Sequence, residues 1–251
     1  MLTDEQLDRY SRQLLVPDID LEGQQALRRS RVLIVGCGGL GNPAALYLAG
    51  AGVGTLQLVD PDHVELSNLH RQVAYRSTDV GQSKAATLAE RVAQLNSDVV
   101  VHAEQQYAEA EWLEKQVLLA DVVLDCSDNF VTRQAINRAC VAQNVSLVSG
   151  AATAMDGQLS VFDRRHAGGP CYACLFGTGT DGDTPCSRAG IVGPVVGVIG
   201  TMQAMAAIAM ICGPLLPPRL QVFDGRRLQW REFAMQADPH CPVCAAAQRP
   251  A

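Results

Sequence analysis

The feature that most constrains the fold is a short run of apolar, β-branched residues that ends in closely spaced glycines. Residues 31–36 read RVLIVG, a run of the kind that is buried in a parallel sheet. A helix is expected from about Pro43 to Gly50, because proline suits a first helical turn. A second apolar run covers residues 55–60. The chain therefore begins its main domain with a βαβ unit, whose crossover should be right-handed.

The alternation of strands and helices continues to about residue 150. Further strands are expected at 99–103, 121–126 and 146–149, and further helices at 83–95, 109–119 and 131–143. This order predicts an α/β fold with a doubly wound, mainly parallel, Rossmann-like sheet. Beyond it the pattern changes, and antiparallel strands are expected around a long apolar helix, at 157–163, 220–224 and 228–233.

The N-terminal segment precedes this alternation and predicts helices. Residues 3–15 are expected to form one helix with Thr3 as its N-cap, and residues 22–29 a second, shorter one. No basic-then-apolar run is present in MLTDEQLDRYSRQLL, so a secretory signal is not expected and the protein is predicted to be cytoplasmic.

Charge and hydropathy exclude two classes of partner. A net charge of −6 and a pI near 5.3 argue against a nucleic-acid surface, which needs clustered Lys and Arg. The stretch Ile191 to Gly213 has no charged residue and is long enough to span a bilayer. It carries Pro194 and several glycines and lacks a basic flank, so we expect a buried helix in the core or at a subunit contact, and no membrane.

The glycines after the first strand predict a nucleotide site. Gly36, Gly38 and Gly41 form G-x-G-x-x-G between a strand and a helix, where backbone N–H groups and the helix N-terminus can meet phosphate. Asp60 ends the second strand, where such folds present a carboxylate to ribose hydroxyls. Together they indicate an adenine nucleotide and leave NAD and ATP open.

The segment after Asp60 favours a triphosphate. The sequence SNLHRQ places Asn68 and Arg71 just beyond that carboxylate, and Lys84 starts the next helix. Each cation alone would be an ordinary surface charge. Two cations and an amide near the phosphate loop suit a leaving pyrophosphate, which gains negative charge that must be compensated.

A second polar pair follows the strand DVVLDC. Asp128 and Asn129 should lie at the carboxyl edge of the sheet, beside the glycine loop. The carboxylate of Asp128 is suited to hold Mg²⁺ against phosphates. It is equally suited to cap the helix that starts near Val131, and the sequence leaves both roles open.

Nine cysteines include two CxxC pairs. These pairs are Cys171 with Cys174 and Cys241 with Cys244. Four thiolates make a closed tetrahedral site, for which Zn²⁺ is the usual occupant and the role is structural. A redox CxxC is the alternative. Cys126, Cys140 and Cys212 lie in apolar runs, where a buried thiol is ordinary. Cys37 and Cys186 belong to neither group.

A set of motifs then resembles a known family. The motifs are RYSRQ, GCGGLG, LVDPDHVELSNLHRQ, DCSDN, AGIVGPVVGVIG and the paired CxxC. Over residues 3–246 the chain resembles the E1-like adenylyltransferases, which activate small ubiquitin-like sulfur-carrier proteins. LYLAGAGVGTL, FDGRRLQW and CPVC make it more similar to the thiamine branch of that family than to the molybdopterin branch.

The resemblance implies one domain over residues 1–251. Its nucleotide-binding part would cover 1–150, and its carrier-binding, zinc-bearing part 151–251. The residues implied to bind MgATP are Gly36, Gly38, Gly39, Gly41, Asp60, Ser67, Asn68, Arg71, Lys84, Asp128 and Asn129. Arg12 would reach in from the other subunit of a homodimer.

The resemblance also implies the reaction. The carboxylate of the carrier's terminal glycine would attack the α-phosphorus of ATP, giving an acyl-adenylate and pyrophosphate, without a general base because that carboxylate is already ionised. Cys186 matches a cysteine that in the thiamine branch can link to the carrier, and a spectator thiol is its alternative. A separate sulfurtransferase would supply the sulfur, because the chain ends soon after Cys244.

Three alternatives remain open on the sequence. The first is the same reaction on the molybdopterin carrier, and the second is an NAD-dependent oxidoreductase. The third is a binding module that recognises a ubiquitin-like partner without turnover. The complete set of phosphate-facing residues disfavours the third.

Overall fold

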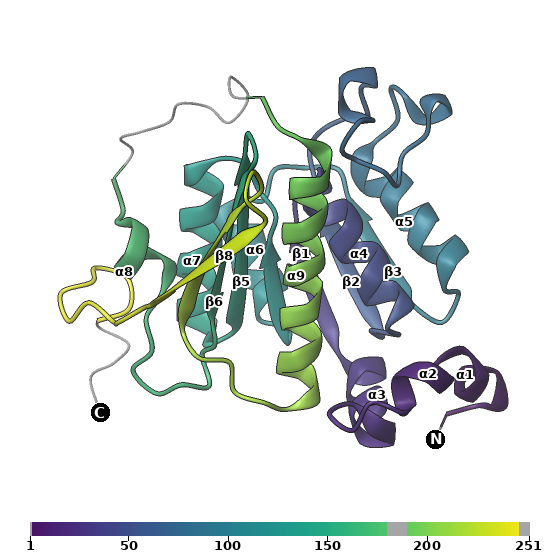
Figure 1. The fold of residues 1–251 in the computed structure, drawn as a ribbon, viewed down its shortest axis with the longest axis horizontal. Helices are drawn as coiled ribbons and strands as arrows, with labels where there is room; N and C mark the ends of the chain where they lie inside the picture. The colour runs from purple at the N-terminus through teal and green to yellow at the C-terminus, as the bar shows by residue number, and fades with distance from the viewer. Residues whose placement is uncertain (1, 180–189, 246–251) are drawn as a thin grey trace.

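The structure is a computed structural model that describes residues 2–179 and 190–245. One sheet lies at the centre of this part of the chain. It has eight strands in the order β3-β2-β1-β4-β5-β6-β7-β8 (Figure 1). The strands are β1 Arg31–Val35, β2 Thr55–Val59, β3 Val100–Glu104, β4 Val122–Asp125, β5 Ser146–Thr153, β6 Asp156–Phe162, β7 Arg219–Asp224 and β8 Gln229–Ala234. β1 to β5 pair in parallel, and β5 to β8 pair antiparallel. The predicted α/β class, with antiparallel strands at its C-terminal end, is confirmed.

Helices cover both faces of the sheet (Figure 1). The first face is packed by α4 Gly41–Gly50, α5 Lys84–Leu95 and α9 Gly193–Cys212. The second face is packed by α6 Ala110–Val117 and α7 Phe130–Gln143. In β1, Val32 and Ile34 face the first layer and Leu33 faces the second. Both faces are therefore dry, which is why this strand is an unbroken apolar run.

The strand order places a crevice at one edge of the sheet. After β1 the chain builds β2 and β3 on one side, then returns to place β4 and β5 on the other. The connections that leave β1 and β4 therefore diverge at their carboxyl ends. In open α/β sheets ligands bind in the crevice outside such a switch point.

The apolar helix α9 packs against the protein. By length and composition it is able to cross a membrane, and half of its most apolar window is buried inside the protein. It lies along α4 and across β5 and β6 (Figure 1). Its glycines allow this approach, since a Cβ on Gly200 would lie 2.2 Å from the carbonyl oxygen of Leu40.

The expected helix at residues 3–15 is wrong as one element. It divides into α1 Asp4–Arg9 and α2 Ser11–Leu14, which precede α3 Asp20–Arg29. Tyr10 lies at the break and is almost fully buried, and its hydroxyl accepts a hydrogen bond from Nδ2 of Asn96 at 2.9 Å. Anchoring this ring against the body of the domain interrupts the helix. The predicted cap is confirmed, because the Thr3 side chain accepts from the N–H of Gln6.

Three short helical elements were not predicted. They are η1 Leu66–Asn68, η2 Ser77–Asp79 and α8 Tyr172–Phe176. The first two lie in the connection between β2 and α5, and the third begins directly after Cys171 and contains Cys174. Such single turns have too few residues to show a helical period.

Candidate active site

The glycine loop after β1 is required by close backbone contacts. Gly36 has a φ of +97°, and a Cβ there would lie 2.6 Å from the carbonyl oxygen of Cys126. A Cβ on Gly41, where α4 begins, would lie 1.9 Å from the carbonyl oxygen of Gly36. Only glycine fits both places. The loop therefore turns tightly enough to direct the N-terminus of α4 towards the crevice.

The peptide of Cys37 fixes the loop from both sides. Its N–H donates to Oδ2 of Asp60 at 2.7 Å, and its carbonyl accepts from Nδ2 of Asn42 at 2.9 Å and lies 2.7 Å from the hydroxyl of Tyr75. The thiol is fully buried, and burial together with the Asp60 charge raises its pKa well above the usual value. Cys37 thus holds the loop through its backbone and keeps its thiol protonated.

Asp60 lies at the predicted place, at the carboxyl end of β2. Its carboxylate accepts from the N–H groups of Cys37 and Asp62, at 2.7 and 2.8 Å. Burial raises its pKa, while these hydrogen bonds and the charge of Lys84 oppose that rise. Each carboxylate oxygen has a further lone pair, so the group can still accept from ribose hydroxyls.

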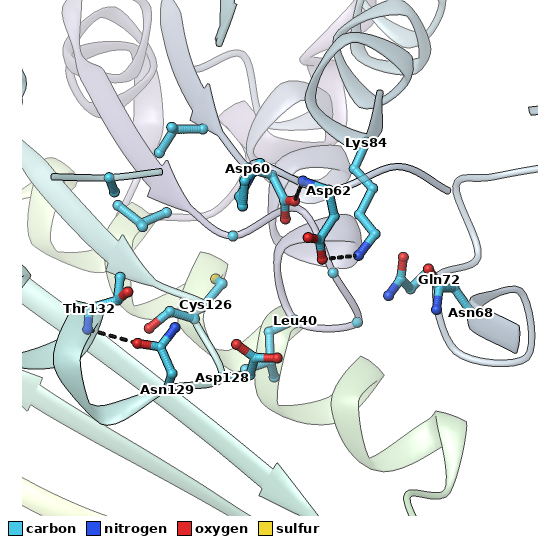
Figure 2. A pocket seen from close by; sticks show the side chains of 18 of the residues that line it. Leu40, Asp60, Asp62, Asn68, Gln72, Lys84, Cys126, Asp128, Asn129 and Thr132 are labelled. Atoms are coloured by element: carbon cyan, nitrogen blue, oxygen red, sulfur yellow. Dashed lines mark hydrogen bonds and ion pairs between the residues drawn. The ribbon is translucent and has the colours of Figure 1, made fainter. Parts of the chain in front are cut away.

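Lys84 and Asp62 form an ion pair inside the crevice. The Nζ of Lys84 lies 2.8 Å from Oδ2 of Asp62, and its side chain is only 9% exposed whereas that of Asp62 is 62% exposed. Figure 2 shows the pair beside Asp60. The N–H of Lys84 also donates to the carbonyl of Asp62, at 3.0 Å. An ammonium carries three N–H donors, so this one can serve a phosphate as well as its carboxylate.

The SNLHRQ segment places Asn68 and Arg71 at the crevice. Asn68 is buried, and its Oδ1 accepts from the N–H of Glu65 at 3.2 Å. Arg71 Nη1 donates to the carbonyl of Ser67 at 3.0 Å. The Ser67 hydroxyl donates to the Glu65 carboxylate, and Ser67 itself does not line the crevice. The 3₁₀ turn η1 therefore presents the amide and turns the serine outward, and the turn that follows it presents the guanidinium.

The structure separates the two roles considered for Asp128. Asn129 is the N-cap of α7, because its Oδ1 accepts the N–H of Thr132 at 2.9 Å (Figure 2). Asp128 is exposed and lines the crevice between β4 and α7. The capping role expected as one alternative for Asp128 thus belongs to its neighbour.

These residues line one cleft of about 450 Å³ at the carboxyl edge of the sheet. It brings together Gly36, Gly38 and Gly39 of the glycine loop with Asp60, Asn68, Arg71, Lys84, Asp128 and Asn129, whereas Gly41 does not line it. Lining residues that were not predicted include Leu40, Asp62, Gln72, Tyr107, Thr132, Arg133, Ala152, Ile191 and Val196. Most come from loops or from segments far apart in sequence, so no local pattern marks them.

Gln72 is a lining residue that the sequence analysis missed. It is buried, and its Oε1 has no hydrogen-bond partner among the described residues. Its Nε2 lies 3.6 Å from the position of a Cβ on Gly38, so the amide faces the glycine loop. The signal was present, because Gln72 directly follows Arg71 in the motif that indicated the phosphate site.

Two further residues were expected to take part in the reaction. Arg12 is on α2, which contacts α3 near the amino end of β1, and it does not line the cleft of its own chain. Cys186 lies outside the described residues.

The two CxxC pairs meet in space. The four sulfur atoms of Cys171, Cys174, Cys241 and Cys244 lie within 4.8 Å of one another. Across the pairs, Cys171 is 3.7 Å from Cys241 and Cys174 is 3.4 Å from Cys244. Four converging thiols fit a tetrahedral zinc site, and a redox CxxC needs only one pair. The cluster can therefore hold zinc, which would fix the C-terminal segment to α8.

The fold and the cleft define a nucleotide-binding protein of the doubly wound α/β class, with its ligand site at the switch point between β1 and β4. The chain belongs to the ThiF family, whose model matches residues 10–243.

Two relatives cover almost the whole chain. The sulfur carrier protein ThiS adenylyltransferase of Escherichia coli K12 is 49% identical over 98% of this chain and 98% of its own length. The molybdopterin-synthase adenylyltransferase of the same organism is 41% identical over 97% of this chain and 98% of its own length. A solved structure of E. coli MccB with ATP superposes with a TM-score of 0.82 at 25% identity, covering 94% of this chain and 74% of MccB.

Proposed function

We propose that this chain uses ATP to adenylate the C-terminal glycine carboxylate of a small ubiquitin-like sulfur-carrier protein of the thiamine type, with release of pyrophosphate. The observation that carries the proposal is a cleft that joins the glycine loop with the carboxylates of Asp60 and Asp128 and the cations of Arg71 and Lys84. Support from outside the chain comes from a relative that is 49% identical and is named for the ThiS carrier.

The nucleotide would lie along the polar part of the cleft. Asp60 would accept from the ribose, and the glycine loop and the N-terminus of α4 would meet the phosphates. Arg71 and Lys84 line the same cleft. They would face the outer phosphates, where negative charge accumulates as the bond breaks.

The reaction needs no proton transfer. A carboxylate oxygen of the carrier attacks the α-phosphorus of ATP, the bond from that phosphorus to the bridging oxygen breaks, and its electron pair leaves with pyrophosphate. The attacking carboxylate is ionised at neutral pH. The chain therefore contributes positioning of the two substrates and stabilisation of the leaving charge.

Asp128 fits the role of a magnesium ligand. It is exposed in the cleft, and the adjacent Asn129 performs the capping that would otherwise occupy a carboxylate there. Mg²⁺ prefers carboxylate and phosphate oxygens, and when bound it supplies positive charge to the phosphates.

The carrier terminus would enter along the apolar part of the cleft. Leu40, Ala152, Ile191 and Val196 line this part. The space is tight, since a Cβ on Gly39 would already lie 2.8 Å from the Val196 side chain. A chain that ends in glycine has no side chain to accommodate in such a passage.

The proposal also includes a homodimer, a separate sulfur donor and a role for Cys186. Arg12 does not line the cleft of its own chain. In a homodimer it would reach into the cleft of the second copy. A separate sulfurtransferase would convert the adenylated carrier to its thiocarboxylate. Cys186 would link to the carrier during that step or remain a spectator.

ATP–pyrophosphate exchange with purified carriers tests the function. Exchange should depend on the thiamine-type carrier and be slower with the molybdopterin-type carrier. Faster exchange with the molybdopterin carrier would move the chain to the other branch. Nicotinamide binding, with no exchange on either carrier, would replace the proposal with the oxidoreductase alternative.

A further inference from the structure

A fully buried carboxylate lies directly behind the loop that carries Asp128. Asp125 ends β4 and has no exposed surface. Its Oδ1 accepts from the N–H and the hydroxyl of Ser127, at 3.1 and 2.6 Å. Its Oδ2 accepts from the hydroxyl of Ser149 on β5, at 2.8 Å. All three donors are neutral, and the salt bridges within residues 2–179 and 190–245 do not include Asp125.

The hydrogen bonds of Asp125 tie the loop to two strands at once. One oxygen fixes the peptide and the side chain of Ser127, and the other fixes β5. Arg133 of α7 holds the same turn, because its Nη2 donates to the carbonyl of Ser127 at 2.6 Å. The backbone is also held from α9, where Gln203 Nε2 donates to the carbonyl of Asp125 at 2.8 Å. Four elements therefore converge on the residues just before Asp128.

This convergence fixes the backbone immediately before Asp128. Cys126 and Ser127 are buried, whereas Asp128 is exposed at the cleft. Only one fixed peptide separates the anchored Ser127 from the exposed carboxylate, so a shift of the anchor moves that carboxylate directly. A buried ionised group is costly unless its oxygens are fully hydrogen-bonded, and a group held at such a cost can fix a unique local geometry.

We propose that Asp125, through Ser127 and Ser149, is the positioning residue that aims Asp128 at the divalent cation of the bound nucleotide. The inference rests on the proposed function, because it assumes that the cleft takes a metal-bound triphosphate. Asp125 itself touches neither nucleotide nor metal.

The test compares cation binding in four proteins. Ser149→Ala removes one donor from Asp125 and leaves both carboxylates in place, and Asp125→Asn removes the charge. Asp163→Asn is the matched control, since Asp163 is also a buried carboxylate at a strand end and accepts from the hydroxyl of Ser146, at 3.4 Å, on the opposite edge of the sheet. The fourth protein is the unaltered chain.

The readout is Mn²⁺ binding in the presence of a non-hydrolysable ATP analogue, followed by electron paramagnetic resonance. Losing a hydrogen bond to a charged group should weaken Mn²⁺ binding about tenfold in Ser149→Ala. Asp125→Asn should weaken it at least as much. Asp163→Asn should lower the melting temperature while Mn²⁺ affinity stays at the unaltered value.

The outcomes separate the two proposals. If the unaltered protein binds no Mn²⁺ with the analogue, the proposed function fails. If it binds and Ser149→Ala binds equally well, Asp125 does not position Asp128 and this inference is overturned. Should Asp125→Asn not fold, Ser149→Ala alone decides. Equal weakening in Asp163→Asn would also overturn it, because the effect would then be general destabilisation.

Discussion

The ammonium of Lys84 lies 2.8 Å from the carboxylate of Asp62, in a cleft where only the carboxylate is well exposed to solvent. This pair holds the cation at the place where the outer phosphates of ATP are expected. We predict that Lys84→Ala lowers ATP–pyrophosphate exchange about 100-fold or more, by the usual cost of removing one charge-stabilising donor. The loss also leaves Asp62 unpaired beside the phosphates, which adds repulsion.

The matched control for Lys84 is the other lysine of the chain. Lys115→Ala, on the exposed side of α6, should leave the exchange rate unchanged. An exchange rate in Lys84→Ala within a factor of a few of the unaltered protein would remove Lys84 from the reaction.

Asp128 and Asn129 are adjacent and should respond in opposite ways. Asp128→Ala should abolish adenylate formation without changing the melting temperature, because Asp128 is exposed and does not cap α7. Asn129→Ala should cost about 1 kcal/mol of stability by loss of the cap. Thermal melts and exchange assays on both variants measure the contrast. Normal exchange in Asp128→Ala would end its assigned role as a magnesium ligand.

Stripping zinc from the four-thiol cluster should lower thermal stability. A bound ligand at 100 times its Kd stabilises a protein by about 2.7 kcal/mol. For a chain of this size 1 kcal/mol shifts the melting temperature by about 2–4 °C, so the loss should be roughly 5 °C or more. The measurement is differential scanning calorimetry before and after chelation, with metal content determined separately. Full recovery on adding zinc is the control, and an unchanged transition after verified metal loss would contradict a structural role.

The ionised carboxylate of Asp163 should make an acid-sensitive contribution to the free energy of unfolding. Burial opposes its ionisation, yet the hydrogen bonds and charge of Arg165 hold its pKa below the ordinary 3.8. The unfolded chain therefore takes up this proton first as the pH falls. The contribution is complete above the unfolded pKa and is lost as the pH falls below 3.8 towards the folded pKa.

The Asp163 contribution is measured by thermal melts from pH 7 to about pH 3. Asp163→Asn should be less stable than the unaltered protein at neutral pH, and the difference should shrink at the acid end. Arg165 also donates to the carbonyls of Met210, Gly213 and Pro214 at the end of α9, so Arg165→Ala should lower stability across the whole range. A constant difference for Asp163→Asn at every pH would contradict this account.

The predicted parts of the fold are those whose physical cause is local. The strands around residues 31–36 and 55–60 were found because a strand buried on both faces must be apolar throughout. The helix at 3–15 failed because the break at Tyr10 depends on Asn96, a partner 86 residues away. No period or propensity in the N-terminal segment reveals that contact.

The same distinction applies to the site. Asp60, Lys84 and Asp128 were predicted because each follows a strand end or starts a helix in a recognisable motif. Asp62 and Asp125 were missed, since their importance comes from ion pairs and hydrogen bonds across the fold. A carboxylate inside a motif cannot be assigned to ligand or to scaffold until its partners are known.

The position of Arg12 gives a prediction about the assembly. It lies on α2 and does not line its own cleft, so a role in adenylation requires a second copy. Arg12→Ala and Lys84→Ala should each be inactive as homodimers. When the two variants are mixed and allowed to exchange subunits, half of the dimers pair one variant with the other. In each mixed dimer, one cleft combines an intact Lys84 with an intact Arg12 from its neighbour, so activity should recover to about a quarter of that of the unaltered protein. If Arg12 acted within its own chain, the mixed dimer would contain no intact cleft and the mixture would stay inactive.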